Sequence, residues 1–346
     1  MIKVGISQGD INGIGYEIIM KTLLDNRILE ICTPIVYGSS KVAAYHRKAL
    51  NITNFSLNSI KNPEEANSKR SNIINCLDDN VRVELGKSSS IAGEASFRAL
   101  ERAVSDLKDN KIDVLVTAPI NKNNIHSEKF SFFGHTDYLR SMFEVNDVLM
   151  LLVGERMKVG VVTEHIPVSE VPSKITHENV LNKLRILNSS LVKDFAIRKP
   201  RIAVLGLNPH AGDEGLIGNE DKDVIAPVID NAREENILAL GPFPADGLFG
   251  SEIYNKFDAI LAMYHDQGLA PFKALSFDDG VNFTAGLPVI RTSPAHGTAY
   301  EIAGKGEASS NSFRQALYLA CDIYRKRSEH NKLTSNVLEQ QDITGI

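Results

Sequence analysis

The chain has 346 residues, of which 43% are hydrophobic, and its 38 Lys and Arg against 43 Asp and Glu give a formal net charge of −5. This length allows two lobes or one large domain, and no basic run is long enough to follow a nucleic-acid backbone. Three widely spaced cysteines without a CxxC pair argue against a disulfide framework and a thiolate zinc site. With neither a signal-peptide pattern nor a membrane-spanning apolar stretch, the sequence predicts a cytoplasmic globular protein without nucleic-acid or membrane partners.

Short apolar runs rich in β-branched residues recur along the chain and predict buried strands. In chain order they are Val4–Ile6, Pro34–Tyr37, Val114–Thr117, Val148–Val153, Val159–Val162, Ile202–Leu207 and Ala259–Met263. Helix-like stretches alternate with them, as at Gly93–Leu107, and a further helix is expected over Ser312–Ile323. This alternation predicts an α/β fold, in which ligands bind beyond the carboxyl ends of the strands.

Two segments are expected to lie outside this core. Residues 51–80 are polar and weakly periodic, which predicts a peripheral segment. The charged tail from Arg325 onward predicts a surface helix followed by a loose end.

Three histidines each follow a predicted strand within a few residues, in polar, turn-like sequence: His165, His210 and His265. If the strands lie side by side, their ends converge, and neutral imidazoles from several strand ends form an open divalent-metal site. The alternative for each is a hydrogen-bonded turn histidine. The shared position of all three favours the metal site, although the spacing does not name the metal.

Lys273, Asn282 and Arg291 interrupt sequence that is otherwise apolar, and the motif GHTD precedes them at residues 134–137. A phosphate requires cations together with amide and hydroxyl donors. Taken singly, each cation is more often a solvated surface charge. Because buried cations and amides need partners, the apolar flanks favour a phosphate site.

Two glycine-rich stretches need separate interpretations. GDINGIG, residues 9–15, lacks the G-x-G-x-x-G spacing, so it does not predict a Rossmann dinucleotide site. HGTAYEIAGKG, His296–Gly306, permits close approach of backbone to a ligand, or forms only a turn before the next helix. The residues leave these two alternatives open.

Eight motifs together resemble one family. They read ISQGDINGIGYEI, VTAPINK, FFGHTDYL, TEHIPVSEVP, LNPHAGDEGLIGNED, GPFPADGLF, YHDQGLAPFK and GVNFTAGLPVIRTSPAHGTAYEIAGKG. In this order they resemble the signatures of the PdxA family, the 4-hydroxythreonine-4-phosphate dehydrogenases of vitamin B6 synthesis, from residue 2 to about residue 325. The last motif is also similar to a loop of isocitrate and isopropylmalate dehydrogenases.

The resemblance implies a two-lobed α/β/α fold of the isocitrate and isopropylmalate dehydrogenase type, with the active site in the cleft between the lobes. Residues 1–125 plus 295–346 would form the first lobe, and residues 126–294 the second, which would carry the dimer interface. It also implies a homodimer with shared active sites, because in the family the YHDQG histidine, here His265, enters a neighbouring subunit's site.

Carried over motif by motif, the family's metal ligands fall on His165, His210 and His265. Its phosphate and substrate contacts fall on His135, Thr136, Lys273, Asn282 and Arg291, and cofactor contacts are expected at His296, Gly297, Thr298 and Ala299. Lys273 is also expected to take part in catalysis. Asp246 is the candidate general base, with a helix N-cap as the alternative role.

The resemblance implies oxidation of 4-phosphooxy-L-threonine that depends on NAD, or NADP, and on zinc, magnesium, cobalt or manganese. The β-keto acid formed would lose carbon dioxide and give 3-amino-2-oxopropyl phosphate. Asp278 and Asp279 depart from the family pattern beside the expected phosphate site, so substrate identity stays open. The alternatives are a dehydrogenase of a phosphorylated sugar acid (4-phosphoerythronate or threonate 4-phosphate), a metal-dependent phosphatase and a catalytically silent binding protein.

Overall fold

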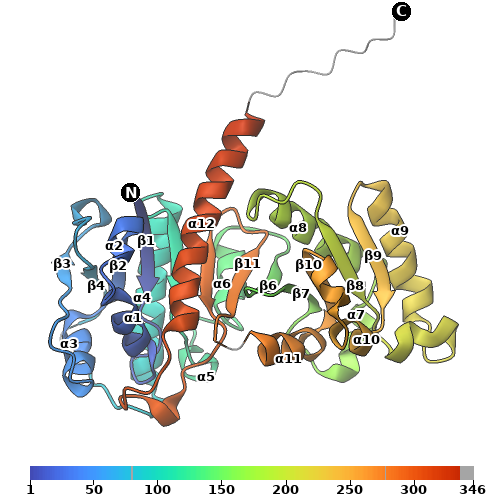
Figure 1. The fold of residues 1–346 in the computed structure, drawn as a ribbon. Helices are drawn as coiled ribbons and strands as arrows, with labels where there is room; N and C mark the ends of the chain where they lie inside the picture. The colour runs from blue at the N-terminus through green and yellow to red at the C-terminus, as the bar shows by residue number, and fades with distance from the viewer. Residues whose placement is uncertain (79–80, 277, 336–346) are drawn as a thin grey trace, which may run out of the picture.

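The computed structural model describes residues 1–78, 81–276 and 278–335. Its strands form one 12-stranded sheet in the order β3-β4-β2-β1-β5-β12-β11-β6-β7-β10-β8-β9, which runs the length of the molecule in Figure 1. The strands are β1 (Ile2–Ser7), β2 (Cys32–Gly38), β3 (Asn58–Ile60), β4 (Asn72–Asn75), β5 (Val114–Thr117), β6 (Leu149–Val153), β7 (Lys158–Thr163), β8 (Arg201–Leu205), β9 (Leu238–Phe243), β10 (Ala259–Tyr264), β11 (Val281–Ala285) and β12 (Arg291–Pro294). The α/β prediction is confirmed, and each strand predicted from an apolar run overlaps an observed one.

Helices cover both faces of this sheet. They are α1 (Gly15–Leu23), α2 (Ile28–Ile31), α3 (Ser40–Ala49), α4 (Ser90–Lys108), α5 (Lys122–Ile125), α6 (His135–Met142), α7 (Val171–Lys174), α8 (His177–Lys193), α9 (Ala226–Glu234), α10 (Ala245–Phe249), α11 (His265–Leu275) and α12 (Asn311–Thr334). The predicted helices fall within α4 and α12. The surface helix predicted after Arg325 is the outer part of α12, while the loose end predicted beyond it lies outside the described residues.

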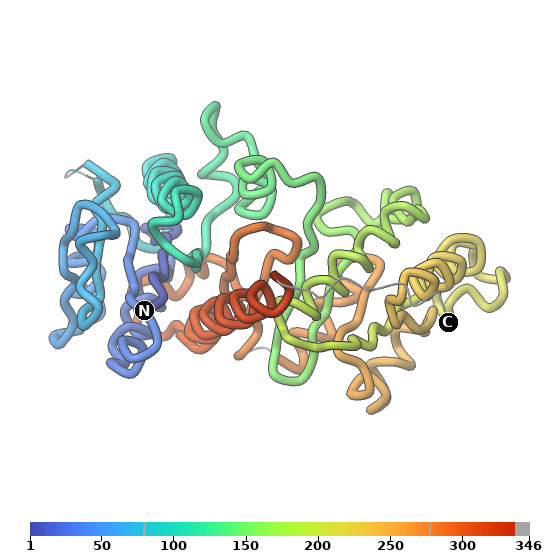
Figure 2. Tube along the Cα trace, turned by 90° about the horizontal axis from the view of Figure 1, so that it is seen from above, coloured from blue at the N-terminus to red at the C-terminus, as the bar shows by residue number. Residues whose placement is uncertain are grey.

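One face of the sheet has a continuous apolar core. It contains Val4 of β1, Leu151 of β6 and Val204 of β8, packed against α1, α8, α9 and α12. Figure 2 shows α12 between the two ends of the molecule. This core continues through the middle of the sheet and is not interrupted between the two predicted lobes. The predicted division into lobes at residues 125 and 295 therefore stays a prediction.

The opposite face has two separate apolar clusters. One packs α4 and α6 against β2 and β5, and the other packs α10 and α11 against β7 and β10. Between them, β11 alternates apolar Val281 and Phe283 with polar Asn282 and Thr284. Side chains alternate in this way along a strand, so the polar ones point into the gap between the clusters.

Strand direction reverses across the middle of the sheet. β5 pairs in parallel with β12, but β12 is antiparallel to β11, β11 to β6, and β6 to β7. β5 and β7 therefore run in opposite directions, and their carboxyl ends lie at opposite ends of the strands. Residues that follow β5 and β7 meet over the open face of the sheet. No helix among the described residues is long and apolar enough to cross a membrane.

Candidate functional site

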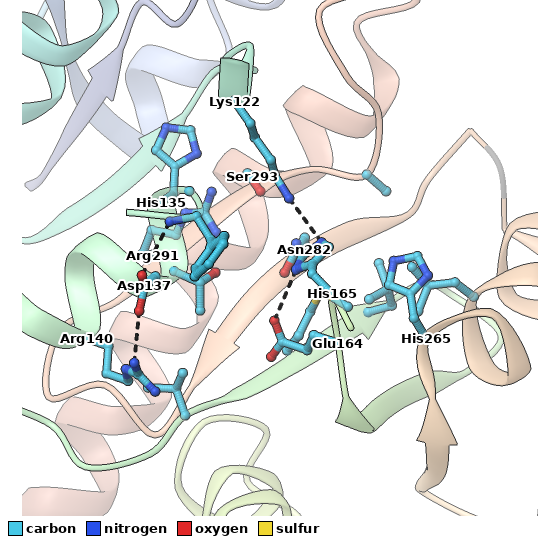
Figure 3. A pocket seen from close by; sticks show the side chains of 18 of the residues that line it. Lys122, His135, Asp137, Arg140, Glu164, His165, His265, Asn282, Arg291 and Ser293 are labelled. Atoms are coloured by element: carbon cyan, nitrogen blue, oxygen red, sulfur yellow. Dashed lines mark hydrogen bonds and ion pairs between the residues drawn. The ribbon is translucent and has the colours of Figure 1, made fainter. Parts of the chain in front are cut away.

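A cavity of about 670 Å³ lies over the gap between the two apolar clusters. Polar residues of the central strands line it, among them Thr117 of β5, Asn282 of β11 and Arg291 of β12. Figure 3 shows His135 and Arg291 at one end of this cavity, His165 and His265 at the other, and Asn282 between them. The two ends have different chemistry.

Arg291 is a buried cation with only neutral partners. It is 3% exposed, its Nη2 and Nε donate to Oγ1 of Thr117 at 2.7 and 3.1 Å, and its Nη1 donates to Oγ1 of Thr284 at 3.3 Å. No carboxylate of the described residues pairs with it. Burial lowers the pKa of Arg291 to about 9, so it remains charged at neutral pH. A buried charge without a counter-ion is costly, and an anion from outside the chain would stabilise it.

His135 lies beside this guanidinium as the first residue of α6. It is buried, and its Nε2 has no hydrogen-bond partner among the described residues. Burial, and then the charges of Arg291 and Lys122, lower the pKa of His135 well below its ordinary value. The ring is therefore neutral and can donate one hydrogen bond to an anion without adding charge. Thr136 lines the cavity from the next position of α6.

Two further predicted contacts line the same cavity. Oδ1 of Asn282 is buried without a partner, so the Asn282 amide has unused hydrogen-bonding capacity toward a ligand. Lys273 is exposed in the last turn of α11. Asp278 and Asp279 do not line the cavity, and Asp279 instead accepts a hydrogen bond from the backbone N–H of Glu155 at 2.7 Å.

At the other end, His165 and His265 come together as predicted from converging strand ends. They follow the adjacent parallel strands β7 and β10, and their ring centroids are 5.6 Å apart. Desolvation, and then the charges of Lys122 and His265, lower the pKa of His165 to about 4. Its imidazole is therefore neutral, the form that binds a metal. His265 Nδ1 lies 2.7 Å from Oδ1 of Asp266, which can fix the orientation of the ring.

His210 and Asp246 do not lie in this cavity. Asp246 follows β9, and the strand order β7-β10-β8-β9 places β10 and β8 between β9 and β7. His210 lies in the turn after β8, where residues 210–214 have left-handed backbone that directs the turn away from the cavity. His210, in η3 (Pro209–Gly215), and Asp246, in the first turn of α10, are both exposed, and η3 packs against α10. Pro244, not Asp246, is the N-cap of α10.

The described residues therefore contain no group of three His, Cys, Asp or Glu arranged to hold a metal. Within one chain, His265 lies beside His165, whereas the resemblance assigned His265 to the site of a neighbouring subunit. It is His210 that lies apart. A three-histidine site requires His210 from another copy of the chain.

The structure adds two residues that sequence reasoning missed. Nζ of Lys122, the first residue of α5, lies 3.1 Å from Nε2 of His165, and desolvation lowers the pKa of Lys122. Burial raises the pKa of Glu164, whose Oε2 lies 3.8 Å from Nδ1 of His165. The available signals were the end of VTAPINK, which contains Lys122, and the position of Glu164 next to His165.

The glycine-rich stretch meets the cavity only at its start. His296 and Gly297 line the cavity, and Nε2 of His296 is buried without a partner. A Cβ added to Gly297 would meet no atom within 4 Å, so there is room above the backbone. Thr298 is instead packed, with its carbonyl accepting from N–H of Ile14 at 3.1 Å, and Ala299 has a left-handed φ of 43°. Nδ1 of His296 lies 3.1 Å from the Gly297 carbonyl, so Nδ1 carries the proton and Nε2 is an acceptor. An unpaired acceptor beside open backbone fits a bound dinucleotide.

Comparisons with known proteins identify the family to which the chain belongs. The family model of the pyridoxal phosphate biosynthetic protein PdxA matches residues 30–320. The chain is 54% identical to the 4-hydroxythreonine-4-phosphate dehydrogenase of Bacteroides thetaiotaomicron over 342 residues, 98% of this chain and 93% of that one. It is 39% identical to the D-threonate 4-phosphate dehydrogenase of Cupriavidus necator, over 94% and 98% of the two chains. The crystal structure of the 4-hydroxythreonine-4-phosphate dehydrogenase of Klebsiella pneumoniae is 34% identical with a TM-score of 0.80, over 93% and 98%.

Proposed function

The chain belongs to the PdxA family of pyridoxal phosphate biosynthetic proteins and is an oxidoreductase acting on a CH–OH group, and we propose that it oxidises 4-phosphooxy-L-threonine with NAD and a divalent metal. The keto acid would lose carbon dioxide to give 3-amino-2-oxopropyl phosphate. The observation that carries the proposal is Arg291, a buried guanidinium without a carboxylate partner at one end of the cavity. A substrate phosphate would supply the missing counter-ion.

Phosphate binding would orient the substrate. Arg291 would donate two parallel hydrogen bonds, and neutral His135 would add one from Nε2. Thr136, Lys273 and Asn282 would supply the remaining donors from the cavity wall. Because this end lies away from the histidine pair, its binding energy would serve to orient the reacting carbon.

The metal would be held by three imidazoles from two subunits of a homodimer. His165 and His265 of one chain lie close enough to offer two imidazole nitrogens to a divalent ion, and His210 of a second copy would be the third. Because η3 packs against α10, the same copy would bring Asp246 with it. When bound, the ion supplies a Lewis acid that stabilises negative charge on the substrate oxygen.

The chain offers two groups to accept the hydroxyl proton. Asp246, the candidate general base, would act only from the second copy. Lys122 is available within one chain. Because desolvation lowers its pKa, a larger fraction of Lys122 is in the neutral, basic form at working pH than for an ordinary lysine. NAD, or NADP, would bind with its nicotinamide end toward His296 and Gly297, where the loop opens into the cavity.

A second candidate substrate is D-threonate 4-phosphate, because a relative 39% identical over 94% of this chain is named for its oxidation. The test is NADH absorbance with purified protein and a divalent metal, comparing 4-phosphooxy-L-threonine, 4-phospho-D-erythronate and D-threonate 4-phosphate. Activity with only the first supports the proposal. Activity with only a sugar acid supports the alternative, and phosphate release without NADH formation indicates a phosphatase.

The shared metal site has its own test. Two inactive variants, His165→Ala and His210→Ala, are dissociated, mixed and reassociated. If His210 acts across the interface, each heterodimer has one intact site and activity returns. If both histidines act within one chain, mixing restores nothing.

A further inference from the structure

The Tyr300 hydroxyl joins segments that are far apart in the sequence. Tyr300 begins η6 (Tyr300–Ile302) within the glycine-rich stretch, and its hydroxyl donates to Oδ2 of Asp10 at 2.7 Å. Nδ2 of Asn124 donates to the same Asp10 oxygen at 2.8 Å and to the Tyr300 hydroxyl at 3.3 Å. The side chains of Asn121 and Ser88 also approach the hydroxyl. One oxygen atom thus connects the turn after β1, the start of α5 and the segment before α4.

Asp10 gives this junction a rigid base. It is fully buried, its backbone N–H donates to the Pro119 carbonyl at 2.9 Å, and its Oδ1 accepts from the backbone N–H of Asn12 at 2.8 Å. Burial, followed by the hydrogen bond to Asp10, raises the pKa of Tyr300 to about 12. The hydroxyl therefore stays protonated and keeps donating at working pH.

Each side of the junction leads to the cavity. On one side, Tyr300 is three residues from Gly297, where the loop opens into the cavity. On the other, Asn124 lies in α5, whose first residue, Lys122, contacts His165. If Tyr300 and Asn124 lose their shared partner, the loop and α5 are free to shift relative to each other.

We propose that Tyr300 is a positioning residue, whose hydroxyl holds the glycine-rich loop in register with α5 so that the bound cofactor and Lys122 are placed together. This role rests on the proposed function, because it takes the loop at His296 and Gly297 as part of the cofactor site. The proposed role predicts two results. Removing the hydroxyl must weaken cofactor binding, and so must a change in α5 outside the loop.

The first test compares Tyr300→Phe with Tyr37→Phe. Tyr37 of β2 is a matched control, because its hydroxyl also donates to a buried carboxylate, Oδ2 of Asp106 at 3.0 Å, and neither residue lines the cavity. Kd for NADH is measured from the change in NADH fluorescence on binding. Tyr300→Phe should raise Kd for NADH and KM for NAD about three- to tenfold, which corresponds to the net contribution of one intramolecular hydrogen bond, and leave KM for the phosphorylated substrate within about twofold.

The second test addresses the link to α5. Asn124→Ala removes both bonds that the Asn124 side chain makes to the junction and leaves the contact between Tyr300 and Asp10 in place. It should raise Kd for NADH, although Asn124 belongs to no part of the cofactor loop. The double variant Tyr300→Phe, Asn124→Ala should bind NADH only slightly more weakly than Tyr300→Phe alone, because both changes break the same junction.

Three outcomes would overturn the role. The first is that Tyr300→Phe binds NADH as tightly as the wild type does. The second is that Tyr37→Phe weakens NADH binding as much as Tyr300→Phe does, because this would indicate a general loss of stability. Additive effects of Tyr300→Phe and Asn124→Ala would also contradict a single junction. A wild-type protein that fails to bind NADH would refute the proposed cofactor itself, which is a separate result from a wild type that binds NADH with Tyr300→Phe unchanged.

Discussion

Replacing Arg291 with methionine should abolish phosphate recognition and, at the same time, stabilise the fold. Burial lowers the pKa of Arg291 from 12.5 to about 9, so at neutral pH the folded chain carries a charge that water would solvate better. That shift corresponds to a cost of about 5 kcal/mol, as an order of magnitude. The lost hydrogen bonds to Thr117 and Thr284 offset part of it, so Arg291→Met should raise the free energy of unfolding by about 1–3 kcal/mol.

Activity should change in the opposite direction. Two charge-assisted hydrogen bonds to the phosphate would contribute about 3–6 kcal/mol to binding in the transition state, so kcat/KM should fall by about 10²- to 10⁴-fold. Turnover should fall along with affinity, because the proposed phosphate contacts would orient the reacting carbon.

The assay is thermal unfolding with and without inorganic phosphate. Phosphate should raise the melting temperature of the wild type and leave Arg291→Met unchanged, since only the folded wild type has the site. Arg327→Met is the control, and it should change the free energy of unfolding in the opposite direction. Arg327 Nε pairs with buried Asp194 at 2.6 Å, so its removal leaves an unpaired carboxylate and should destabilise the fold by about 3–5 kcal/mol. If Arg291→Met is destabilised like Arg327→Met and still responds to phosphate, the buried cation is structural and the argument fails.

Lys122→Met removes a neighbouring charge and should raise the pKa of His165 above its value of about 4, as measured by histidine NMR in metal-free protein. An unchanged titration would show that Lys122 does not affect the pKa of His165. Because the pKa of His165 is below its ordinary 6.5 in the folded chain, the unfolded state binds more protons between these values. The free energy of unfolding of metal-free protein should therefore decrease as pH falls from about 6.5 to about 4, and His165→Gln should reduce this slope in denaturant titrations. His165→Ala and His265→Ala should each lose divalent-metal binding in calorimetry, whereas His126→Ala, exposed and outside the cavity, should retain it.

The apolar runs were sufficient to predict seven strands, β1, β2, β5, β6, β7, β8 and β10, because burial on both faces leaves little alternative to a strand for a short β-branched segment. They did not predict β3, β4, β9, β11 and β12. The pairing of His165 with His265 also followed from the sequence, since both come after parallel strands. His210 did not follow, because its position depends on the strand order and on the left-handed backbone after β8. Neither feature has a local sequence signal, and a site shared between chains has none at all.

The strongest unused signal was the alternation in β11. In Val281–Ala285, apolar residues point to the continuous core, and Asn282 and Thr284 point to the open face. A strand with one polar face in the middle of an otherwise buried sheet has to border either solvent or a ligand. The register pairs Asn282 with Ser293 of β12, and Arg291 follows the same alternation two residues earlier, so the phosphate end is built from neighbouring strands. Because strands hold side chains more rigidly than loops do, the cation can remain buried and unpaired before the proposed phosphate binds.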